Sequence, residues 1–240
     1  MDPPGARPED TPEDSAEDRP EDSAEEGPDA WAMQVVVHAE KTGPPARSAV
    51  CAAAATAVAR VLTTPDPGWQ EAVRRWEAGP IRKVTRRARG VRWTAVQRLP
   101  GVTVECAGAE VRAFVPAPVT RLAPELSRLQ VAGLDLTDDP DAPAAPPQPP
   151  YAAISVNPHV RMSTGKAAAQ CGHAAHLLVR QAPEPGRSAW IAAGSRAHLV
   201  RAEAWRDSVA RAAVAVRDAG WTEVPPGTMT AVARIVTSLP

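Results

Sequence analysis

Residues 151–240 alternate between short apolar runs and longer stretches with helical spacing. YAAISVNPH (151–159) has the apolar run typical of a buried strand, and the alanine-rich stretch that begins near Thr164 has the length of a helix. The remaining predicted elements are strands over AHLV (197–200), AAVAV (212–216) and MTAVARIV (229–236), and a short helix over EAWRDSVAR (203–211). Helices that alternate with short apolar strands predict an α/β fold, with helices on both faces of a sheet.

A similar order of elements opens the first part of the chain, where WAMQVVVHA (31–39) predicts a strand and ARSAVCAAAATAVARVL (46–62) a helix. A shift of 120 positions pairs Trp31 with Tyr151, Cys51 with Cys171, and Arg60 with Arg180. A shift of 112 positions pairs WTAVQRLPGVTVECAG (93–108) with WRDSVARAAVAVRDAG (205–220). Because both shifts keep the order of elements, we interpret the chain as an internal duplication with diverged copies.

Two segments of biased composition set the predicted boundaries. The acidic repeat in residues 1–30 has almost nothing apolar to bury, which predicts a disordered tail. The proline-rich stretch that ends residues 121–150 predicts a semi-rigid linker. The two copies of the duplication then occupy residues 31–120 and 151–240.

Charge is distributed unevenly, although the total is only −1 at pH 7. Residues 1–30 hold twelve acidic and two basic side chains, residues 31–120 six acidic and thirteen basic, and residues 151–240 five acidic and ten basic. Two basic regions suit a polyanionic partner, with which the acidic tail would compete. A solvated basic surface with a solubilising tail explains the charge alone equally well.

Other features exclude several classes of protein. The N-terminus is acidic and proline-rich, unlike a secretory signal, and no run of 18 apolar residues is long enough to span a membrane. The three cysteines form no CxxC pair, which fits a reducing cytosol better than a disulfide scaffold or a zinc site. We therefore expect a cytoplasmic protein with no metal site and no membrane partner.

Lys166, Gln170 and His173 are spaced i, i+4, i+7 in the helix that begins near Thr164, so they share one face. Ser163 or Thr164 is the expected N-cap, which places Lys166 in the first turn, where anions bind. Taken singly, a solvated lysine and a core histidine are the simpler interpretations. His176 lies off this face and is interpreted as structural.

The second polar stretch is RDAGWTEVPPGTMT (217–230). Asp218 follows an apolar run at the end of a strand, where active sites of α/β proteins usually lie. Gly220 and Gly227 allow positive φ, so the loop would hold Thr222 with little freedom. A capped hairpin loop without function is an equal alternative.

Together the two stretches resemble the type 2 peptidyl-tRNA hydrolases. The resemblance rests on M-S-T-G-K-A-A-A-Q-C-G-H-A (162–174) followed by R-D-A-G-x-T-E-x-P-P-G-T-x-T (217–230), and it covers residues 151–236. It implies an α/β/α domain around a four-stranded mixed sheet, often dimeric, that hydrolyses the ester between a peptide and the 3′ ribose of tRNA without metal or cofactor. It also implies site residues, with catalytic roles for Lys166, His173, Asp218 and Thr222, and substrate-binding roles for Gly165, Gln170 and Gly220.

In this interpretation Asp218 orients or activates water, assisted by His173 if that side chain is neutral. Lys166 stabilises the developing negative charge or holds the terminal phosphate, and Thr222 hydrogen-bonds the ribose or the peptide carbonyl. Two departures bear on this expectation. Family members show Arg-x-Asp-Leu where this chain has Asn157, Pro158, His159 and Val160, and the segment between the motifs is short, which predicts a truncated helix around 203–211.

The first copy carries a different set of residues. In place of Lys166, Gln170, His173 and Asp218 it has Ala46, Val50, Ala53 and Cys106, which predicts an inactive copy. Its stretch IRKVTRRARGVRWTAVQR (81–98) contains no acid, and the candidates for binding tRNA phosphates are Arg82, Lys83, Arg86 and Arg87. We expect a monomer that acts as an internal pseudo-dimer, in which the first copy replaces a second subunit.

Two other functions stay open at this point. One is a non-catalytic module that binds tRNA or the ribosome. The other is a hydrolase of a different acyl or amide substrate on the same scaffold. A basic groove beside the motifs would favour tRNA, whereas a closed apolar pocket would favour a small substrate.

Overall fold

The computed structural model describes residues 30–138, 145–220 and 223–238, so the predicted acidic tail and Thr222 lie outside the described residues. The first half of the protein (residues 30–120) contains the strands β1 (Trp31–His38), β2 (Lys83–Ala88), β3 (Gly101–Cys106), β4 (Ala109–Phe114) and β5 (Ala117–Pro118). The second half (residues 151–238) contains β6 (Tyr151–Val156), β7 (Ala197–Leu199), β8 (Val214–Arg217) and β9 (Met229–Val236).

Helices connect these strands in the same general order in both halves. Those of the first half are α1 (Arg47–Thr63), α2 (Pro67–Glu77) and α3 (Gly90–Val96), followed by the 3-10 turn η1 (Val119–Arg121) and α4 (Pro124–Ser127). Those of the second half are α5 (Thr164–Gln181), α6 (Gly186–Ala192), the 3-10 turn η2 (Ala202–Ala204) and α7 (Trp205–Ala210). In the described part of the chain no single helix is long and apolar enough to cross a membrane. The pair α1 and α2, which meet at a 110° bend, has the length and composition of a broken membrane span, and no other property of such a span is shown.

The two sheets share one strand order and one set of directions. The first is ordered β2-β1-β4-β3, with β5 paired to β1, and the second is ordered β7-β6-β9-β8. In each sheet the opening strand runs parallel to the second strand of its half and antiparallel to the last long strand. The α/β class with mixed sheets is therefore confirmed.

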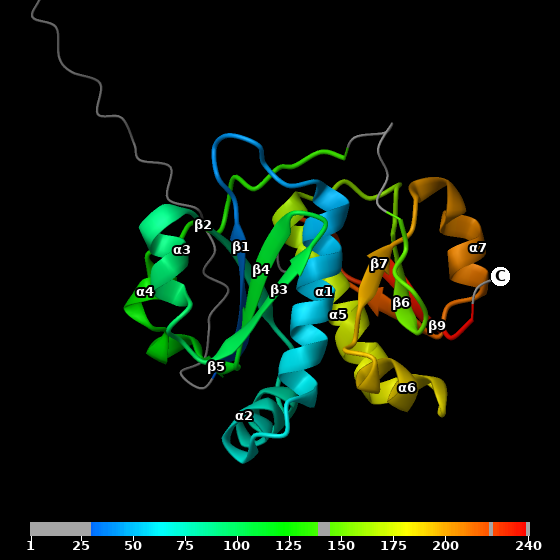
Figure 1. The fold of residues 1–240 in the computed structure, drawn as a ribbon, viewed down its shortest axis with the longest axis horizontal. Coiled ribbons are helices and arrows are strands. Elements are labelled where there is room, and N and C mark those ends of the chain that lie inside the picture. The colour runs from blue at the N-terminus through cyan, green and yellow to red at the C-terminus, as the bar shows by residue number, and fades with distance from the viewer. Residues whose placement is uncertain (1–29, 139–144, 221–222, 239–240) are drawn as a thin grey trace, which may run out of the picture.

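The helices α1 and α5 pack against each other between the two sheets (Figure 1). Both are rich in alanine and buried almost all round, which lets the helices and both sheets approach closely. A Cβ on Gly172 of α5 would lie 3.1 Å from Val58 Cγ2 of α1, closer than most side-chain contacts. One buried apolar cluster therefore runs through both halves.

The sequence analysis did not predict the helices α2 and α6. Along the chain, each follows the long helix of its half and precedes the second strand. Asp66 caps α2 by accepting from Trp69 N at 3.0 Å, and Pro67 stands in the first turn. In each half one tryptophan is fully buried and donates its indole N–H to the carbonyl of the residue before the second strand: Trp76 to Arg82, and Trp190 to Arg196.

Residues 121–138, expected to belong to a linker, pack closely against both halves. Leu126 and Leu129 are buried with α3 on the outer face of the first sheet. Further on, Leu134 O accepts from Thr164 N at 3.0 Å, and Leu136 N donates to Thr164 Oγ1 at 2.8 Å. These two hydrogen bonds fix the N-terminus of α5. The segment packs against the protein because it contains leucines to bury, which the proline-rich part that follows lacks.

Thr56 of α1 joins the two halves through a buried hydrogen bond. Its hydroxyl accepts from Ala197 N of the edge strand β7 at 3.0 Å and donates to Ala52 O at 2.9 Å. We expect Thr56→Val to lower the free energy of unfolding by about 1–3 kcal/mol, because the Ala197 N–H loses its acceptor. Denaturant unfolding of this variant beside Thr63→Val, whose hydroxyl bonds only within its own helix turn, measures the difference. Equal losses would show that the bond between the halves adds nothing.

Candidate active site

Ser163 begins α5 and sets the direction of the polar helix face. Its hydroxyl accepts from Lys166 N at 3.1 Å, so the predicted N-cap is confirmed. Lys166 then lies in the first turn, and Gln170 and His173 follow one and two turns later on the same side of the helix.

Asp218 lies at the end of β8, and its carboxylate accepts from three donors. Lys166 Nζ lies 2.6 Å from Oδ2, Gln170 Nε2 donates to Oδ2 at 2.7 Å, and Gly220 N donates to Oδ1 at 2.8 Å. The orientation of Gln170 is set in turn by Thr230, whose hydroxyl donates to Gln170 Oε1 at 2.8 Å. The structure thus brings Lys166, Gln170, Gly220 and Asp218 together.

The ion pair between Lys166 and Asp218 is deeply buried. Their side chains are 13% and 4% exposed. Withdrawing two charges from water costs several kcal/mol, which their attraction and added hydrogen bonds only partly return. A buried ion pair that costs free energy and lies on an otherwise alanine-rich helix marks a candidate functional site.

His173 extends this face toward the first half. Its Nδ1 lies 3.2 Å from Nζ of Lys83, on β2. Burial lowers the pKa of His173 well below its ordinary value, and the nearby positive charge of Lys83 lowers it further, followed by smaller effects of His176 and Lys166. The imidazole is therefore neutral at neutral pH.

The loop after β8 carries Glu223, which sequence reasoning overlooked although it stands within the second motif. Its carboxylate accepts from Ser163 N at 2.7 Å and from Ser163 Oγ at 2.6 Å. An acidic side chain thus covers the helix end at which an anion site was expected. A Cβ on Gly165, which is expected to bind substrate, would lie 3.8 Å from Ser163 Oγ and 3.8 Å from Thr85 Cβ of β2, an ordinary van der Waals distance. Thr222 lies outside the described residues.

Gly220 has a φ of +83°, and a Cβ on it would lie 2.6 Å from Pro226 Cδ and 2.7 Å from Pro226 N. We expect Gly220→Ala to displace the loop and remove the Gly220 N–H from Asp218, lowering turnover on the site's substrate at least tenfold while the fold persists. Gly227→Ala is the matched control, since Gly227 has a φ of +79° in the same loop but an unobstructed Cβ position. Equal turnover by the two variants would show that the loop geometry at Asp218 is not needed.

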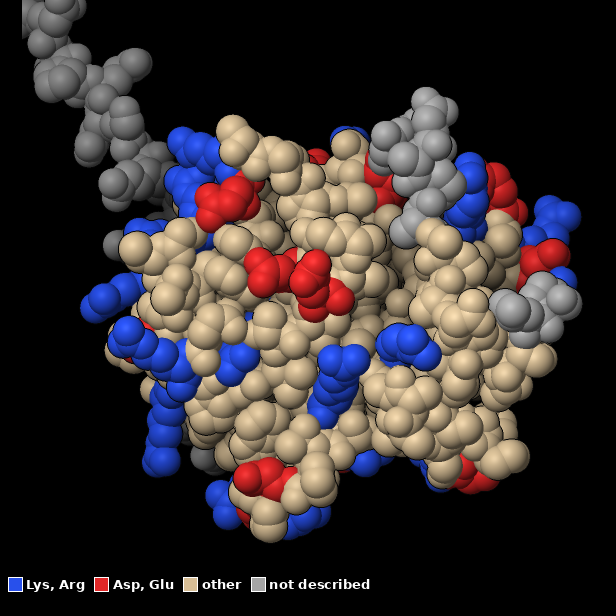
Figure 2. All heavy atoms as spheres, in the orientation of Figure 1, with Lys and Arg blue, Asp and Glu red and all other residues tan. Residues whose placement is uncertain are grey.

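Within the basic stretch 81–98, the four residues expected to bind phosphates, 82, 83, 86 and 87, are half-buried or buried. Lys83 is only 9% exposed, and Arg86 donates to Gln34 Oε1 and Leu129 O. Arg87 is hydrogen-bonded to Gln130 Oε1, and Arg82 is half-buried. Five exposed arginines lie on and beside α3 and α4, where Figure 2 shows basic side chains gathered at one edge: Arg89, Arg92, Arg98, Arg121 and Arg128.

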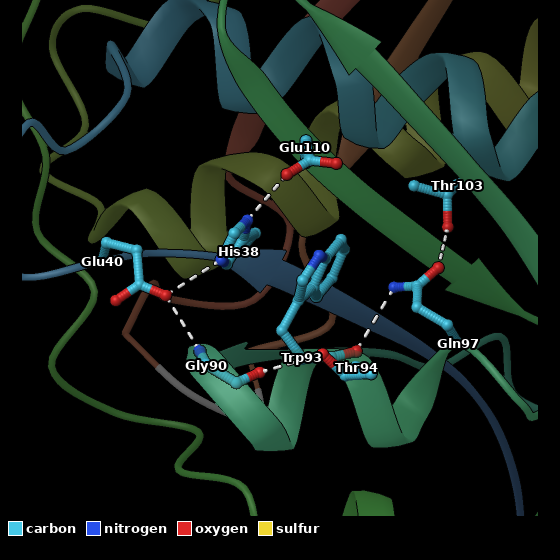
Figure 3. Close-up of polar contacts among 8 residues, drawn as sticks. All are labelled: His38, Glu40, Gly90, Trp93, Thr94, Gln97, Thr103 and Glu110. Carbon is cyan, nitrogen blue, oxygen red and sulfur yellow. Dashed lines mark hydrogen bonds and ion pairs between the residues drawn. The ribbon is translucent and has the colours of Figure 1, made fainter.

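A second polar cluster surrounds His38 at the end of β1 (Figure 3). Nδ1 of His38 lies 2.7 Å from Glu110 Oε2, Nε2 lies 3.1 Å from Glu40 Oε1, and the ring stacks on Trp93 at 4.8 Å. Glu40 also accepts from Gly90 N at 2.9 Å. Both ring nitrogens are thus engaged by neighbouring side chains, and the cluster ties β1, β4 and α3 together.

A cavity of about 1140 Å³ opens between the halves and is lined by Ala46 and Cys106, the counterparts of the second half's polar residues. Lys166, Gln170, His173 and Asp218 do not line it. Burial raises the pKa of the Cys106 thiol, which keeps it protonated and unreactive. No group of three or more His, Cys, Asp or Glu side chains that could hold a metal ion occurs among the described residues.

The residues that depart from the expected Arg-x-Asp-Leu pattern brace the sheet. Asn157 Nδ2 donates to Met229 O at 2.8 Å, and Asn157 N donates to Thr230 O at 2.9 Å. Thr230 orients Gln170 through its hydroxyl, so Asn157 stabilises the polar cluster indirectly, through its hydrogen bond to the backbone of Thr230. His159 is exposed, and its backbone N–H donates to Asn157 Oδ1.

Comparison with known proteins places the similarity in the second half. Residues 151–235 match the family described as "Peptidyl-tRNA hydrolase PTH2". The chain is 36% identical over 91 residues to a protein of Staphylothermus marinus named "Peptidyl-tRNA hydrolase", and the match covers 33% of this chain and 75% of that protein. The matched region contains α5, β8 and the loop that follows, and so the whole Lys166–Asp218 cluster.

Proposed function

The chain belongs to the peptidyl-tRNA hydrolase PTH2 family and is a hydrolase of the ester in peptidyl-tRNA, and we propose that the buried pair Lys166–Asp218 performs this reaction. The observation that carries the proposal is the 2.6 Å contact between Lys166 Nζ and Asp218 Oδ2 at the start of a helix. Gln170 supports the pair through its 2.7 Å bond to the same carboxylate oxygen. Thr222 and the backbone of Gly220 complete the proposed site. The reaction frees tRNA whose peptide was not completed.

The chemistry assigned to the pair follows from their charges. Asp218 accepts the proton of a water molecule as the water oxygen attacks the ester carbonyl carbon. The ammonium of Lys166 stabilises the negative charge that develops on the carbonyl oxygen, inside a site where burial strengthens the interaction. Collapse of the tetrahedral intermediate breaks the bond to the ribose oxygen, which takes up the proton held by Asp218 and leaves as the 3′ end of tRNA.

The duplication is a further part of the proposal, supported by three parallels between the halves. The strand order and directions coincide, and Trp76–Arg82 and Trp190–Arg196 form the same indole-to-carbonyl bond. The third parallel is reciprocal, since Arg60 of α1 donates to Gly194 O beyond α6 and Arg180 of α5 donates to Glu77 of α2. The first half then acts as the inactive partner within a monomeric pseudo-dimer.

For binding the tRNA backbone we propose the exposed arginines around α3 and α4, in place of the segment 82–87. Exposed guanidinium groups can neutralise phosphates, whereas a buried lysine or a guanidinium bonded to a neighbouring carbonyl contributes little. Association with ribosomes and a cytoplasmic location would follow from a substrate that arises during translation.

The test is release of a labelled N-acetylated amino acid from tRNA by the intact purified chain. We expect catalytic release, with free tRNA as the other product. A chain that bound tRNA without releasing the label would be a binding module, the alternative that the family match does not favour. Hydrolysis of small acyl esters or amides without release from tRNA would point to a different substrate on this scaffold.

A further inference from the structure

Lys83 of the first half lies at the centre of a buried cluster beside the proposed active site. Its Nζ lies 3.2 Å from Nδ1 of His173 and 3.4 Å from Nδ1 of His176, and 4.6 Å above the ring of Trp76. Lys83 and Trp76 come from the first half, whereas both histidines come from α5 of the second. This lysine therefore reaches across the boundary between the halves.

The hydrogen-bonding capacity of the lysine decides which ring nitrogens carry protons. Burial lowers the pKa of Lys83 well below its ordinary value, and the charge of Glu77 opposes this effect. An ammonium has three N–H groups and a neutral amine still has two, so either form can donate to both Nδ1 atoms. Nζ lies within hydrogen-bond distance of both Nδ1 atoms, and the π face of Trp76 favours a positive charge at this position. A neutral imidazole whose Nδ1 accepts must carry its proton on Nε2.

The surroundings of the cluster agree with this arrangement. His176 Nε2 lies 2.7 Å from Glu77 Oε1, as expected for an Nε2–H donor, and Glu77 also accepts from Arg180 at 2.8 Å. Burial, with Lys83 as the next cause, lowers the pKa of His176 to about 4, against a smaller opposing effect of Glu77. Burial and the charge of Lys83 also lower the pKa of His173 well below its ordinary value. Both rings are neutral under ordinary conditions.

We propose that Lys83, contributed by the inactive half, is a positioning residue that holds His173 as its Nε2–H tautomer and so makes His173 a hydrogen-bond donor to the substrate. This inference rests on the proposed function of the Lys166–Asp218 pair. A neutral Nε2–H imidazole whose Nδ1 is already bonded to Lys83 cannot take a proton from water, so the role of base falls to Asp218. Nε2–H instead donates to an oxygen of the tRNA ester or its ribose. The contact between Lys83 and His173 also assigns a role to the first half, because the first half supplies a residue that the second half lacks.

The direct test is the ¹⁵N spectrum of the imidazole groups in the intact chain at neutral pH, with the His173 signals identified by their loss in His173→Gln. We expect a protonated Nε2 and an unprotonated Nδ1 for His173. In Lys83→Met we expect a mixture of tautomers, or a ring that becomes protonated at higher pH because the neighbouring charge is gone. An Nδ1–H tautomer in the unsubstituted chain, or an unchanged His173 spectrum in Lys83→Met, would overturn the inference.

Kinetics supply the second readout. We expect Lys83→Met to lower kcat for release of N-acetylated amino acid from tRNA by about 10- to 100-fold with little change in KM, as for residues that orient a functional histidine. Lys41→Met, at an exposed lysine of the same half, should leave both constants unchanged. Unchanged kcat in Lys83→Met would contradict the positioning role. Because the spectrum needs no turnover, failure of the proposed function would appear separately, as no release by the unsubstituted chain.

Discussion

Asp218→Asn should abolish nearly all turnover, with kcat for release of N-acetylated amino acid from tRNA about 10²–10⁴-fold lower. The substitution keeps the size of the side chain but removes the group that accepts a proton from water. It also turns an amide N–H₂ or a neutral oxygen toward Lys166 and Gln170, which both donate to Asp218 Oδ2 in the unsubstituted protein. Single-turnover release, at enzyme in excess over tRNA, measures the chemical step without product dissociation.

Asp207→Asn provides the control for this change. Asp207 lies on α7 of the same half, and its side chain is 73% exposed. Its turnover should match that of the unsubstituted chain. If Asp218→Asn kept more than about a tenth of the activity, Asp218 would not be the base, because general-base catalysis contributes at least about a hundredfold.

Lys166→Met should lower kcat by about 10²–10³-fold, the loss typical for removing one stabilising group from an oxyanion site. Methionine keeps the length of the side chain without its charge, so Asp218 would remain buried beside two donors instead of three. Removing one partner of a buried pair is also destabilising, by up to about 3–5 kcal/mol. Thermal unfolding must therefore be recorded beside turnover.

Lys41→Met is the matched control for Lys166→Met, since Lys41 is exposed. It should leave turnover and thermal unfolding unchanged. If Lys166→Met remained folded at the assay temperature and hydrolysed at the normal rate, the lysine would serve only the stability of the site.

Local patterns predicted the second half well. The apolar run MTAVARIV became β9 over the predicted residues, and the shortened segment between the motifs produced the six-residue helix α7. The i, i+4, i+7 spacing placed Lys166, Gln170 and His173 on one face because helical geometry requires it. The apolar run before Asp218 predicted its place at the end of a strand, and the family resemblance grouped it with the helix residues that it contacts.

Long-range packing was beyond the reach of these patterns. Lys83 stands in a stretch of arginines and looked like a surface cation, but α5 packs over β2 and buries it. No periodicity in one segment reveals which helix of the other half will cover it. The helices α2 and α6 were missed as well. Long-range packing does not explain the omission of α2, because Asp66 followed by Pro67 is a local sequence signal for a helix N-terminus.

The most direct test of the Lys166–Asp218 pair as the catalytic unit is a double-variant cycle. Single-turnover release of N-acetylated amino acid from tRNA would be measured for the unsubstituted chain, Lys166→Met, Asp218→Asn and the combined variant. Residues that act as a unit are strongly non-additive, so we predict that the combined variant is no slower than the slower single variant. Losses that multiply in the combined variant, or appreciable hydrolysis that survives both substitutions, would contradict the assignment.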